Sequence, residues 1–178
     1  SGIVRHIGFA TIRFPARWSR YYEADYEPET FSFLRKNLKP GDTYLDIGGH
    51  IGLFAVVGAK LVEPSGKVYS FEPTPFTREV LRSTVELNKC DKIVKICPEA
   101  ISDDSGTAEF FDTGVAVSNA NSLVPLTSAQ NKIIVPMTSI DQFVEEHDIS
   151  PNCIKIDVEG AEFLALKGAE NTIKNKRP

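Results

Sequence analysis

The sequence has few cysteines, no excess of basic residues and no long apolar run. Its three cysteines, Cys90, Cys97 and Cys153, are odd in number and widely spaced, which argues against a disulfide framework or a cysteine metal site. Two of them lie in apolar, strand-like contexts, so we expect buried free thiols. Such thiols fit a reducing compartment, and we therefore expect the protein in the cytoplasm.

Charge and hydropathy exclude two further classes of protein. The formal net charge is -4 over 178 residues, whereas a protein that binds nucleic acid needs a basic surface for the phosphate backbone. No apolar run is long enough to cross a bilayer, and no cleavable secretory pattern precedes the first expected strand. With 42% hydrophobic residues, the chain can bury one sizeable core, as expected of a soluble enzyme.

A strand, a glycine-rich turn and a helix follow one another in the first half of the chain. Residues 43–47 have the pattern of a short buried strand, and residues 53–62 are apolar almost all round, as in a helix packed against a sheet. Between them, Gly48, Gly49 and Gly52 allow a sharp turn, and we expect their backbone to lie close against a ligand. The free N–H groups at the start of the helix favour anionic groups there.

A second apolar strand, residues 67–71, ends in an acid, Glu72. Glu72 follows Gly52 by twenty residues. In open α/β sheets that bind a nucleoside cofactor, the acid that hydrogen-bonds the ribose lies ~20 residues after the glycine turn. The pattern predicts a doubly wound, Rossmann-like α/β fold, with a nucleoside pocket at the carboxyl ends of its strands. Glu72 and the adjoining Pro73 are expected at the ribose.

The turn does not match the Gly-x-Gly-x-x-Gly fingerprint of dinucleotide-binding proteins. It contains Asp46-x-Gly48-Gly49-His50-x-Gly52, and the carboxylate of Asp46 would repel a pyrophosphate but attract an amino or sulfonium group. S-adenosylmethionine carries both cationic groups and no phosphate. The turn therefore favours this cofactor over NAD or NADP. The alternative for so short a motif is an ordinary corner between a strand and a helix.

Further strands and helices alternate along the rest of the chain. We expect a strand or hairpin at 3–14, helices at 28–38, 76–89, 139–147 and 161–174, and strands at 93–97, 107–111, 133–135 and 152–157. Ser139 is expected to cap its helix, with Gln142 at the capping-box position. The segment from Asp112 to Asn131 is rich in Ser, Asn, Thr and Ala without periodicity, which fits either a substrate-binding loop or a disordered insertion.

Three acids lie at or just after the strand at residues 152–157. In a doubly wound sheet the end of this strand lies beside the glycine turn, so Asp157, Glu159 and Glu162 are expected at the rim of the pocket. Asp157 is expected to contact the ligand. The alternative for Glu159 and Glu162 is that they only stabilise the N-terminus of the following helix, which carries a partial positive charge. For Glu162 we prefer this alternative.

Several motifs resemble the FkbM-type S-adenosylmethionine-dependent methyltransferases in order and spacing. They are DIGGHIG (46–52), FEPTP (71–75), AISDDSG (100–106), NSL (121–123), TSID (138–141) and IKIDVEGAE (154–162). The resemblance begins near Pro40, so we divide the chain into an N-terminal extension (1–39) and a methyltransferase domain (40–178). Members of the family usually carry a small residue and then Asn where this chain has Gly49 and His50, which leaves the role of His50 open.

The resemblance implies transfer of a sulfonium methyl group to a hydroxyl oxygen of a small molecule or glycan. The implied cofactor contacts are Asp46, Gly48, Gly49, His50 and Gly52 for the methionine part, Glu72 and Pro73 for the ribose, Glu99 and Ala100 for the adenine, and Asp157 near the methyl group. Glu159 or His50, beside Asp157, is the candidate base. No metal ligand is assigned.

Several alternatives accompany this interpretation. His50 has a simpler role as a hydrogen-bond donor to a loop carbonyl, and the aromatic cluster of Trp18, Tyr21, Tyr22 and Tyr26 either covers the substrate or, as the simpler expectation, packs beneath it. A sheet of the family is expected to continue past Pro178, so we expect a C-terminally incomplete sheet edge. The functional alternatives are an NAD(P)-type oxidoreductase and a catalytically silent S-adenosylmethionine-binding module.

Overall fold

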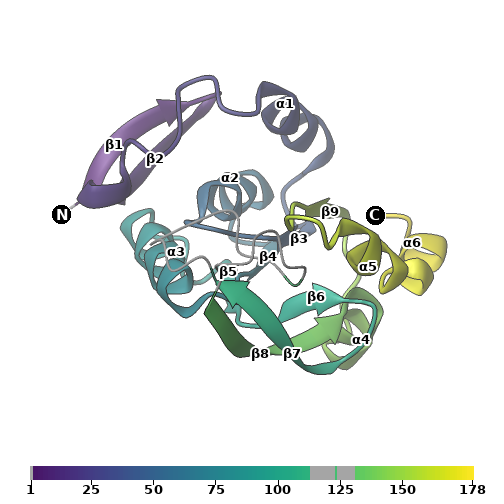
Figure 1. Ribbon diagram of the computed structural model, residues 1–178. Helices are drawn as coiled ribbons and strands as arrows, with labels where there is room; N and C mark the ends of the chain where they lie inside the picture. The colour runs from purple at the N-terminus through teal and green to yellow at the C-terminus, as the bar shows by residue number, and fades with distance from the viewer. Residues whose placement is uncertain (1, 113–122, 124–130) are drawn as a thin grey trace.

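The computed structural model describes residues 2–112, 123 and 131–178 (Figure 1). Its central sheet has the strand order β5-β4-β3-β9, and every neighbouring pair in it is parallel. The strands are β3 (Thr43–Ile47), β4 (Lys67–Phe71), β5 (Val94–Cys97) and β9 (Cys153–Ile156). Helices α2 (Leu53–Val62) and α3 (Pro75–Leu87) connect the first three. The predicted Rossmann-like parallel sheet is confirmed.

The order of the strands creates a switch point at β3. From β3 the chain runs outward through β4 to β5, and it returns later to pair β9 with the other side of β3. Ile47, at the end of β3, is in register with Phe71 on β4 and with Ile156 on β9. The carboxyl ends of three strands therefore meet where an open α/β sheet binds its ligands.

Side chains of β3 alternate between two separate cores. Tyr44 packs into a cluster that includes side chains of α2 and α3, whereas Leu45 and Ile47 pack with side chains of α4 (Ile140–Glu146) and α5 (Glu162–Lys167) on the other face. Successive strand residues point to opposite faces, so Asp46 lies on the same face as Tyr44. Both faces of the sheet are covered, as is usual for parallel sheets.

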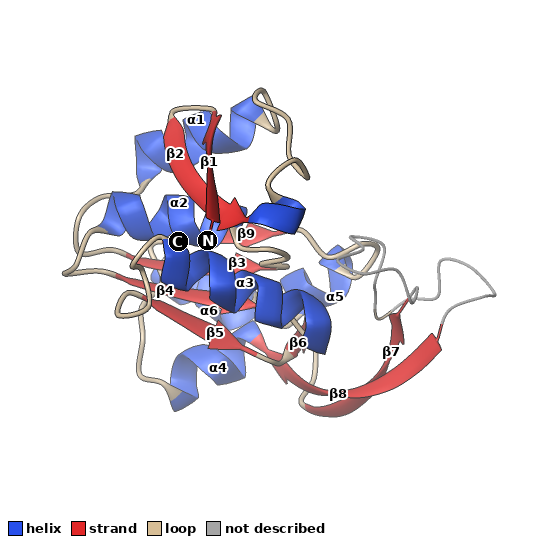
Figure 2. Cartoon of the chain, turned by 90° about the vertical axis from the view of Figure 1, so that its left-hand side faces the viewer, coloured by secondary structure: helices blue, strands red, loops and turns tan. Residues whose placement is uncertain are grey.

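The N-terminal residues form a hairpin and a helix over α2 and α3 (Figures 1 and 2). The elements are β1 (Gly2–Ile7), β2 (Ala10–Pro15), the short η1 (Ala16–Trp18) and α1 (Pro28–Asn37). Asn88, after α3, donates to the carbonyl of Arg13 at 2.8 Å and accepts from its N–H at 3.0 Å. The predicted hairpin and helix are confirmed. Their apolar side chains belong to the same cluster as those of α2 and α3.

A second, three-stranded sheet has the order β6-β8-β7. It consists of β6 (Ala100–Ser102), β7 (Gly106–Asp112) and β8 (Asn131–Ser139), with β8 parallel to β6 and antiparallel to β7. The predicted strands at 107–111 and 133–135 are confirmed, and both are longer than expected. β6 was not predicted, because three buried residues are too few to show a period. Apart from Leu123, the expected loop between the two longer strands lies outside the described residues.

The helix cap predicted at Ser139 is confirmed, whereas the single helix predicted at 161–174 is wrong. Ser139 Oγ accepts from the N–H of Gln142 at 3.1 Å at the start of α4. The C-terminal segment forms α5 and then α6 (Glu170–Lys176). The carbonyl of Gly168 accepts from the N–H of Asp141, whose carboxylate accepts two N–H groups in the first turn of α6. These contacts with α4 override the local helical pattern.

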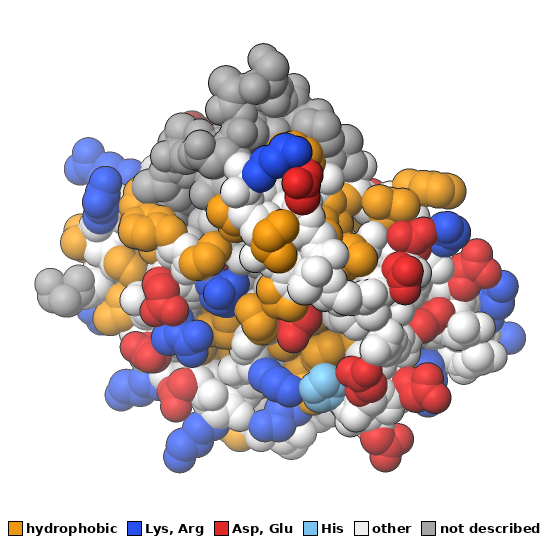
Figure 3. Space-filling model, turned by 60° about the horizontal axis from the view of Figure 1, so that its bottom comes forward, with side chains coloured by type: hydrophobic (Ala, Val, Ile, Leu, Met, Phe, Trp, Pro, Cys, Tyr) orange, Lys and Arg blue, Asp and Glu red, His pale blue; other side chains and the backbone are white. Residues whose placement is uncertain are grey.

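The cysteine prediction also holds, since all three thiols are buried and free. Within the described residues, no helix combines the length and apolarity needed to span a bilayer. On the face seen in Figure 3, acidic and basic side chains are mixed with apolar ones. Exposed ion pairs such as Lys132–Glu109, 2.7 Å apart, contribute little to stability.

Candidate active site

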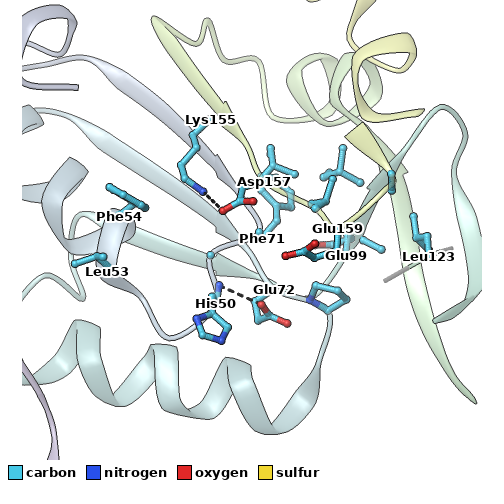
Figure 4. Close-up of a pocket in the computed structure, with 18 of the residues that line it drawn as sticks. His50, Leu53, Phe54, Phe71, Glu72, Glu99, Leu123, Lys155, Asp157 and Glu159 are labelled. Atoms are coloured by element: carbon cyan, nitrogen blue, oxygen red, sulfur yellow. Dashed lines mark hydrogen bonds and ion pairs between the residues drawn. The ribbon is translucent and has the colours of Figure 1, made fainter. Parts of the chain in front are cut away.

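A cavity of about 310 Å³ lies at the carboxyl ends of β3, β4 and β9 (Figure 4). Its volume is at the lower end of the ~300–1,000 Å³ typical of small-molecule sites. The lining comes from stretches within residues 21–27, 47–54, 71–73, 99–101 and 155–161, together with Phe110 and Leu123. The cavity thus occupies the switch point at which the sequence predicts the nucleoside pocket.

The glycine turn lines one side of this cavity and is tightly packed against the sheet. The N–H groups of Gly48 and Gly49 both donate to the carbonyl of Phe71, at 3.1 and 2.8 Å. A Cβ on Gly48 would overlap the carbonyl oxygen of Asp157, and one on Gly49 would overlap the hydroxyl of Ser70. The absence of side chains is therefore required first by the packing of the turn, rather than by the approach of a ligand.

Asp46 does not line the cavity, contrary to the expectation of direct contact with the cofactor. Its side chain is fully buried, and it accepts hydrogen bonds from Ser70 Oγ at 2.9 Å and Tyr44 Oη at 3.4 Å. Burial is the main cause that raises the pKa of this carboxyl, and the nearby charge of Lys155 opposes it. Because β3 alternates, Asp46 points behind Gly49 into the interior. Its carboxyl still interacts electrostatically with Lys155 and Asp157, which line the cavity.

Glu72 lies in the cavity wall, as predicted from its spacing. The side chain is buried, and its two oxygens accept from the N–H groups of His50 at 3.1 Å and Thr74 at 2.8 Å. Burial raises the pKa of this carboxyl from 4.5 to about 7, against the opposing effect of these hydrogen bonds. The backbone therefore fixes the direction in which the carboxylate faces.

His50 occupies a left-handed backbone conformation in the turn, with φ of 48°. Asn and His tolerate this conformation better than most residues, which explains how His50 can stand where the family usually has Asn. Its Nδ1 is hydrogen-bonded to the hydroxyl of Tyr22 at 2.8 Å, and the ring of Tyr21 lies 4.8 Å from the imidazole. The side chain of His50 thus joins the glycine turn to the N-terminal extension.

The end of β9 brings a lysine and two acids to the opposite wall. Lys155 Nζ lies 3.0 Å from Asp157 Oδ2 and 5.0 Å from the ring of Phe54, with its side chain largely buried. Glu159 also lines the cavity. Burial, followed by the charges of Asp157 and Glu162, raises the pKa of the Glu159 carboxyl. The carboxylates at this wall therefore repel one another and would also repel a negatively charged group of a ligand.

Of the remaining predicted site residues, some line the cavity and others do not. Pro73, Glu99 and Ala100 line the cavity. Gly52 does not: it precedes α2 and packs against α3. Glu162 is outside the lining as well, and its carboxylate accepts from the N–H of Gly160 at the start of α5. This position agrees with the preferred local role of Glu162 at the helix end.

Residues 46–178 match the family described as the methyltransferase FkbM domain. The chain belongs to the FkbM methyltransferase family. All six motifs that carried the resemblance fall in this region, and the matched part contains β4, β5 and β9 of the central sheet, the end of β3, the glycine turn and the acids that follow β9. The matched part begins at Asp46, so the three tyrosines of the cavity wall, Tyr21, Tyr22 and Tyr26, lie before it.

Two curated FkbM-type relatives extend the comparison. Hexuronic acid methyltransferase AglP of Haloferax volcanii is 26% identical over 150 residues, which cover 84% of this chain and 59% of AglP. The 31-O-demethyl-FK506 methyltransferase FkbM of Streptomyces tacrolimicus is 25% identical, covering 75% of this chain and 62% of that protein. The chain thus spans about three-fifths of the length of these relatives.

A solved FkbM methyltransferase has the same fold. The structure from Methylobacillus flagellatus KT superposes with a TM-score of 0.53 over 85% of this chain and 39% of that one, at 17% identity. At this identity the likeness concerns the fold alone. The doubly wound sheet is therefore of the type found in S-adenosylmethionine-dependent methyltransferases.

Several lining residues were not predicted as site residues. Lys155 lies within the last FkbM motif, between Ile154 and Ile156, and the alternation of β9 could have indicated that it faces the opposite side of the strand from these two residues. Tyr21, Tyr22 and Tyr26 were recognised as a cluster, and the expectation of packing is correct for Tyr22, which is buried. All three also line the cavity, with Glu27 beside them. No local pattern links this segment to a turn more than twenty residues away.

Proposed function

We propose that this FkbM-family chain binds S-adenosylmethionine and transfers its methyl group to a hydroxyl oxygen of a small molecule or glycan. The family membership supports the reaction class, and the names of two relatives, a hexuronic acid methyltransferase and a 31-O-demethyl-FK506 methyltransferase, support an oxygen acceptor. Since the chain covers only part of those proteins, activity and acceptor are both part of the proposal.

The charge of the cavity carries the choice of cofactor. Among the described lining residues, Lys155 is the one lysine or arginine, and it is held by Asp157. A pyrophosphate group would meet carboxylates and little free positive charge, which opposes a dinucleotide. A phosphate-free adenosyl compound with a net positive charge suits the same wall. This observation favours S-adenosylmethionine over NAD(P).

The proposed binding roles follow the walls of the cavity. Glu72 is oriented by two backbone N–H groups, and its remaining lone pairs suit the two hydroxyls of a ribose. Glu99 and Ala100 line the part of the cavity next to β6 that we assign to the adenine. The backbone of Gly48, Gly49 and His50 is assigned to the methionine part. Asp46 is assigned an indirect role, because its hydrogen bonds go to Ser70 and Tyr44 behind the turn.

Bound S-adenosylmethionine would supply an activated methyl group on a sulfonium centre. The protein then has to hold the acceptor oxygen in line with that group and to accept the hydroxyl proton. Glu159 is the preferred acceptor of the proton, because its raised pKa strengthens its basicity relative to an ordinary carboxylate. Asp157 lies between the lysine and Glu159 and is assigned to the methyl end. His50 is the alternative base.

Thermal unfolding in the presence of S-adenosylhomocysteine tests cofactor choice without an acceptor. At a hundredfold excess over Kd, a ligand adds ~2.7 kcal/mol to the stability of the folded state, which raises the Tm of a domain of this size by roughly 5–10 °C. We expect this shift with S-adenosylhomocysteine and none with NAD. A larger shift with NAD would favour the oxidoreductase alternative and overturn the proposal.

Methyl transfer from labelled S-adenosylmethionine to a panel of glycans and hydroxylated metabolites tests catalysis. If the cofactor product binds but no acceptor gains a methyl group, the silent binding module becomes the better account. For an active acceptor, Glu159→Gln is expected to lower kcat while the Kd for S-adenosylhomocysteine stays nearly constant. Equal losses in both quantities would remove Glu159 as the base.

A cytoplasmic location is also part of the proposal. Its support is chemical: Cys90, Cys97 and Cys153 are all free, and burial raises the pKa of Cys97 to about 12 and that of Cys153 to about 11. Such thiols are neutral and unreactive at physiological pH. Fractionation of cells that express the protein at its natural level tests the location.

A further inference from the structure

The cavity contains more negative charge than the proposed cofactor can balance. Its carboxylates come from separate parts of the chain: Glu27, Glu72, Glu99, Asp157 and Glu159. Lys155 is paired with one of them, Asp157. S-adenosylmethionine brings one net positive charge, so carboxylates remain in excess when it is bound. This reasoning rests on the proposed function.

The excess is concentrated around the N-terminal extension and the loop after β9. The charge of Glu159 contributes to the raised pKa of Tyr21, and the charges of Glu27 and Asp157 contribute to that of Tyr26, with burial the larger cause for both phenols. The rings of Tyr21 and Tyr26 and these acids line the same cavity. The glycine turn and Glu72 line another part of this cavity.

Whatever their position, residues 113–130 cannot supply a compensating cation. Residues 113–130 contain no Asp, Glu, Lys, Arg or His. The charge of the space beside Tyr21 and Tyr26 is thus set by the residues already named. Aromatic faces suit a saturated ring, and hydroxyl or amino groups can donate to the carboxylates.

We propose that this space is the acceptor subsite and that it takes an uncharged or amine-bearing hydroxylated ring, such as a neutral or amino sugar, in preference to a sugar acid. An acceptor that carries a carboxylate or phosphate would be placed against carboxylates, which costs affinity through like-charge repulsion. The subsite would then differ in charge preference from what the name of the Haloferax volcanii relative, a hexuronic acid methyltransferase, indicates for that protein.

Three sugar probes that differ in one group test the charge preference. They are methyl glucoside, the uronate in which its hydroxymethyl group is a carboxylate, and the amino sugar in which it is an aminomethyl group. Binding to protein saturated with S-adenosylhomocysteine is measured by ligand-observed NMR titration at low salt. We expect the uronate to bind at least ~10-fold more weakly than the neutral sugar, and the amino sugar to bind at least as well as the neutral sugar.

Variants separate the subsite from the general charge of the protein. Glu27→Gln and Glu159→Gln should each reduce the discrimination against the uronate, because each removes one carboxylate from the subsite. Glu29→Gln is the matched control: it removes an exposed charge of α1 that does not line the cavity and should leave the discrimination unchanged. An equal effect in the control would assign the preference to the net charge and overturn the subsite.

The remaining outcomes are equally decisive. Equal or tighter binding of the uronate overturns the proposed preference, and so does the failure of all three sugars to bind while S-adenosylhomocysteine binds. In both cases the proposed function stands. If S-adenosylhomocysteine itself does not bind, the proposed function fails and the acceptor subsite fails with it. Binding of the cofactor product and the order of the sugars are thus separate readouts.

Discussion

At Glu72, burial favours the neutral carboxyl, whereas the proposed contact with a ribose favours the charged one. Burial disfavours the ionised form of a carboxyl unless hydrogen bonds stabilise the charge. Two backbone N–H groups donate to Glu72, but they offset the effect of burial only in part, since its pKa remains raised to about 7. In the folded protein this carboxyl is therefore partly neutral and partly charged near physiological pH. A ribose that donates two hydroxyls would favour the charged form.

The raised pKa of Glu72 predicts how stability depends on pH. The folded state holds this proton more tightly than the unfolded chain, so the associated stabilisation is complete below about pH 4.5 and is lost as the pH rises through about 7. Between pH 5 and 8 the wild type should lose about 2–3 kcal/mol more of its unfolding free energy than Glu72→Gln. Urea titrations of both proteins at each pH measure this difference. Parallel losses would show that Glu72 titrates normally.

Asp46 leads to a different prediction, because its partners are protein groups. In Asp46→Ala the hydroxyls of Ser70 and Tyr44 lose their acceptor, which should lower the unfolding free energy by about 1–3 kcal/mol. S-adenosylhomocysteine should still raise the Tm of this variant. The control is Ser70→Ala, which removes the hydrogen bond between Ser70 and Asp46 but leaves the carboxyl of Asp46 in place. A fully stable Asp46→Ala protein that no longer binds the ligand would instead indicate direct contact.

Sequence spacing identified Glu72 but not the direction of Asp46. The position of an acid at the end of a strand follows from the chain order alone. Which face of β3 points at the cavity depends on where the helices pack, and the side chain of Asp46 is on the face of Tyr44, covered by α2 and α3. In a short strand that is buried on both faces, the side chains of the two faces are similarly apolar, so the sequence does not show which of them point toward the cavity.

At the scale of elements, local signals predicted the regular pieces and missed those set by tertiary contacts. The bounds expected for β3, α2 and β4 agree with the structure, because their apolar patterns end at clear turn residues. β6 is too short for a period. The break between α5 and α6 depends on Gly168, where a Cβ would overlap the carbonyl of Ser102, a residue far away in sequence.

The N-terminal extension and the glycine turn are joined through one side-chain pair. Tyr22 is buried, and its hydroxyl is bonded to His50 Nδ1. Tyr22→Phe should cost about 1 kcal/mol of unfolding free energy, and it should weaken S-adenosylhomocysteine binding because the turn that lines the cavity loses a restraint. Calorimetric titration and urea unfolding measure both. Tyr69→Phe, on β4 and outside the cavity lining, is the control, and equal effects in the two variants would remove the special role of Tyr22.

At the scale of the whole molecule, the cavity unites parts with different sequence signals. The matched family region supplies the glycine turn, Glu72 and the acids of β9, whereas the extension before it supplies Tyr21, Tyr22, Tyr26 and Glu27. The first set could be predicted from motifs. The second could not, because its place at the cavity depends on the packing of the hairpin and α1 over α2 and α3. The segment before the matched region therefore completes the wall of the cavity.

A crystal structure with S-adenosylhomocysteine tests the central claim most directly. The account predicts the ligand in the cavity at the ends of β3, β4 and β9, with both ribose hydroxyls within hydrogen-bond distance of Glu72 and the adenine beside Glu99 and Ala100. A ligand bound elsewhere, or a ribose that does not contact Glu72, would contradict it.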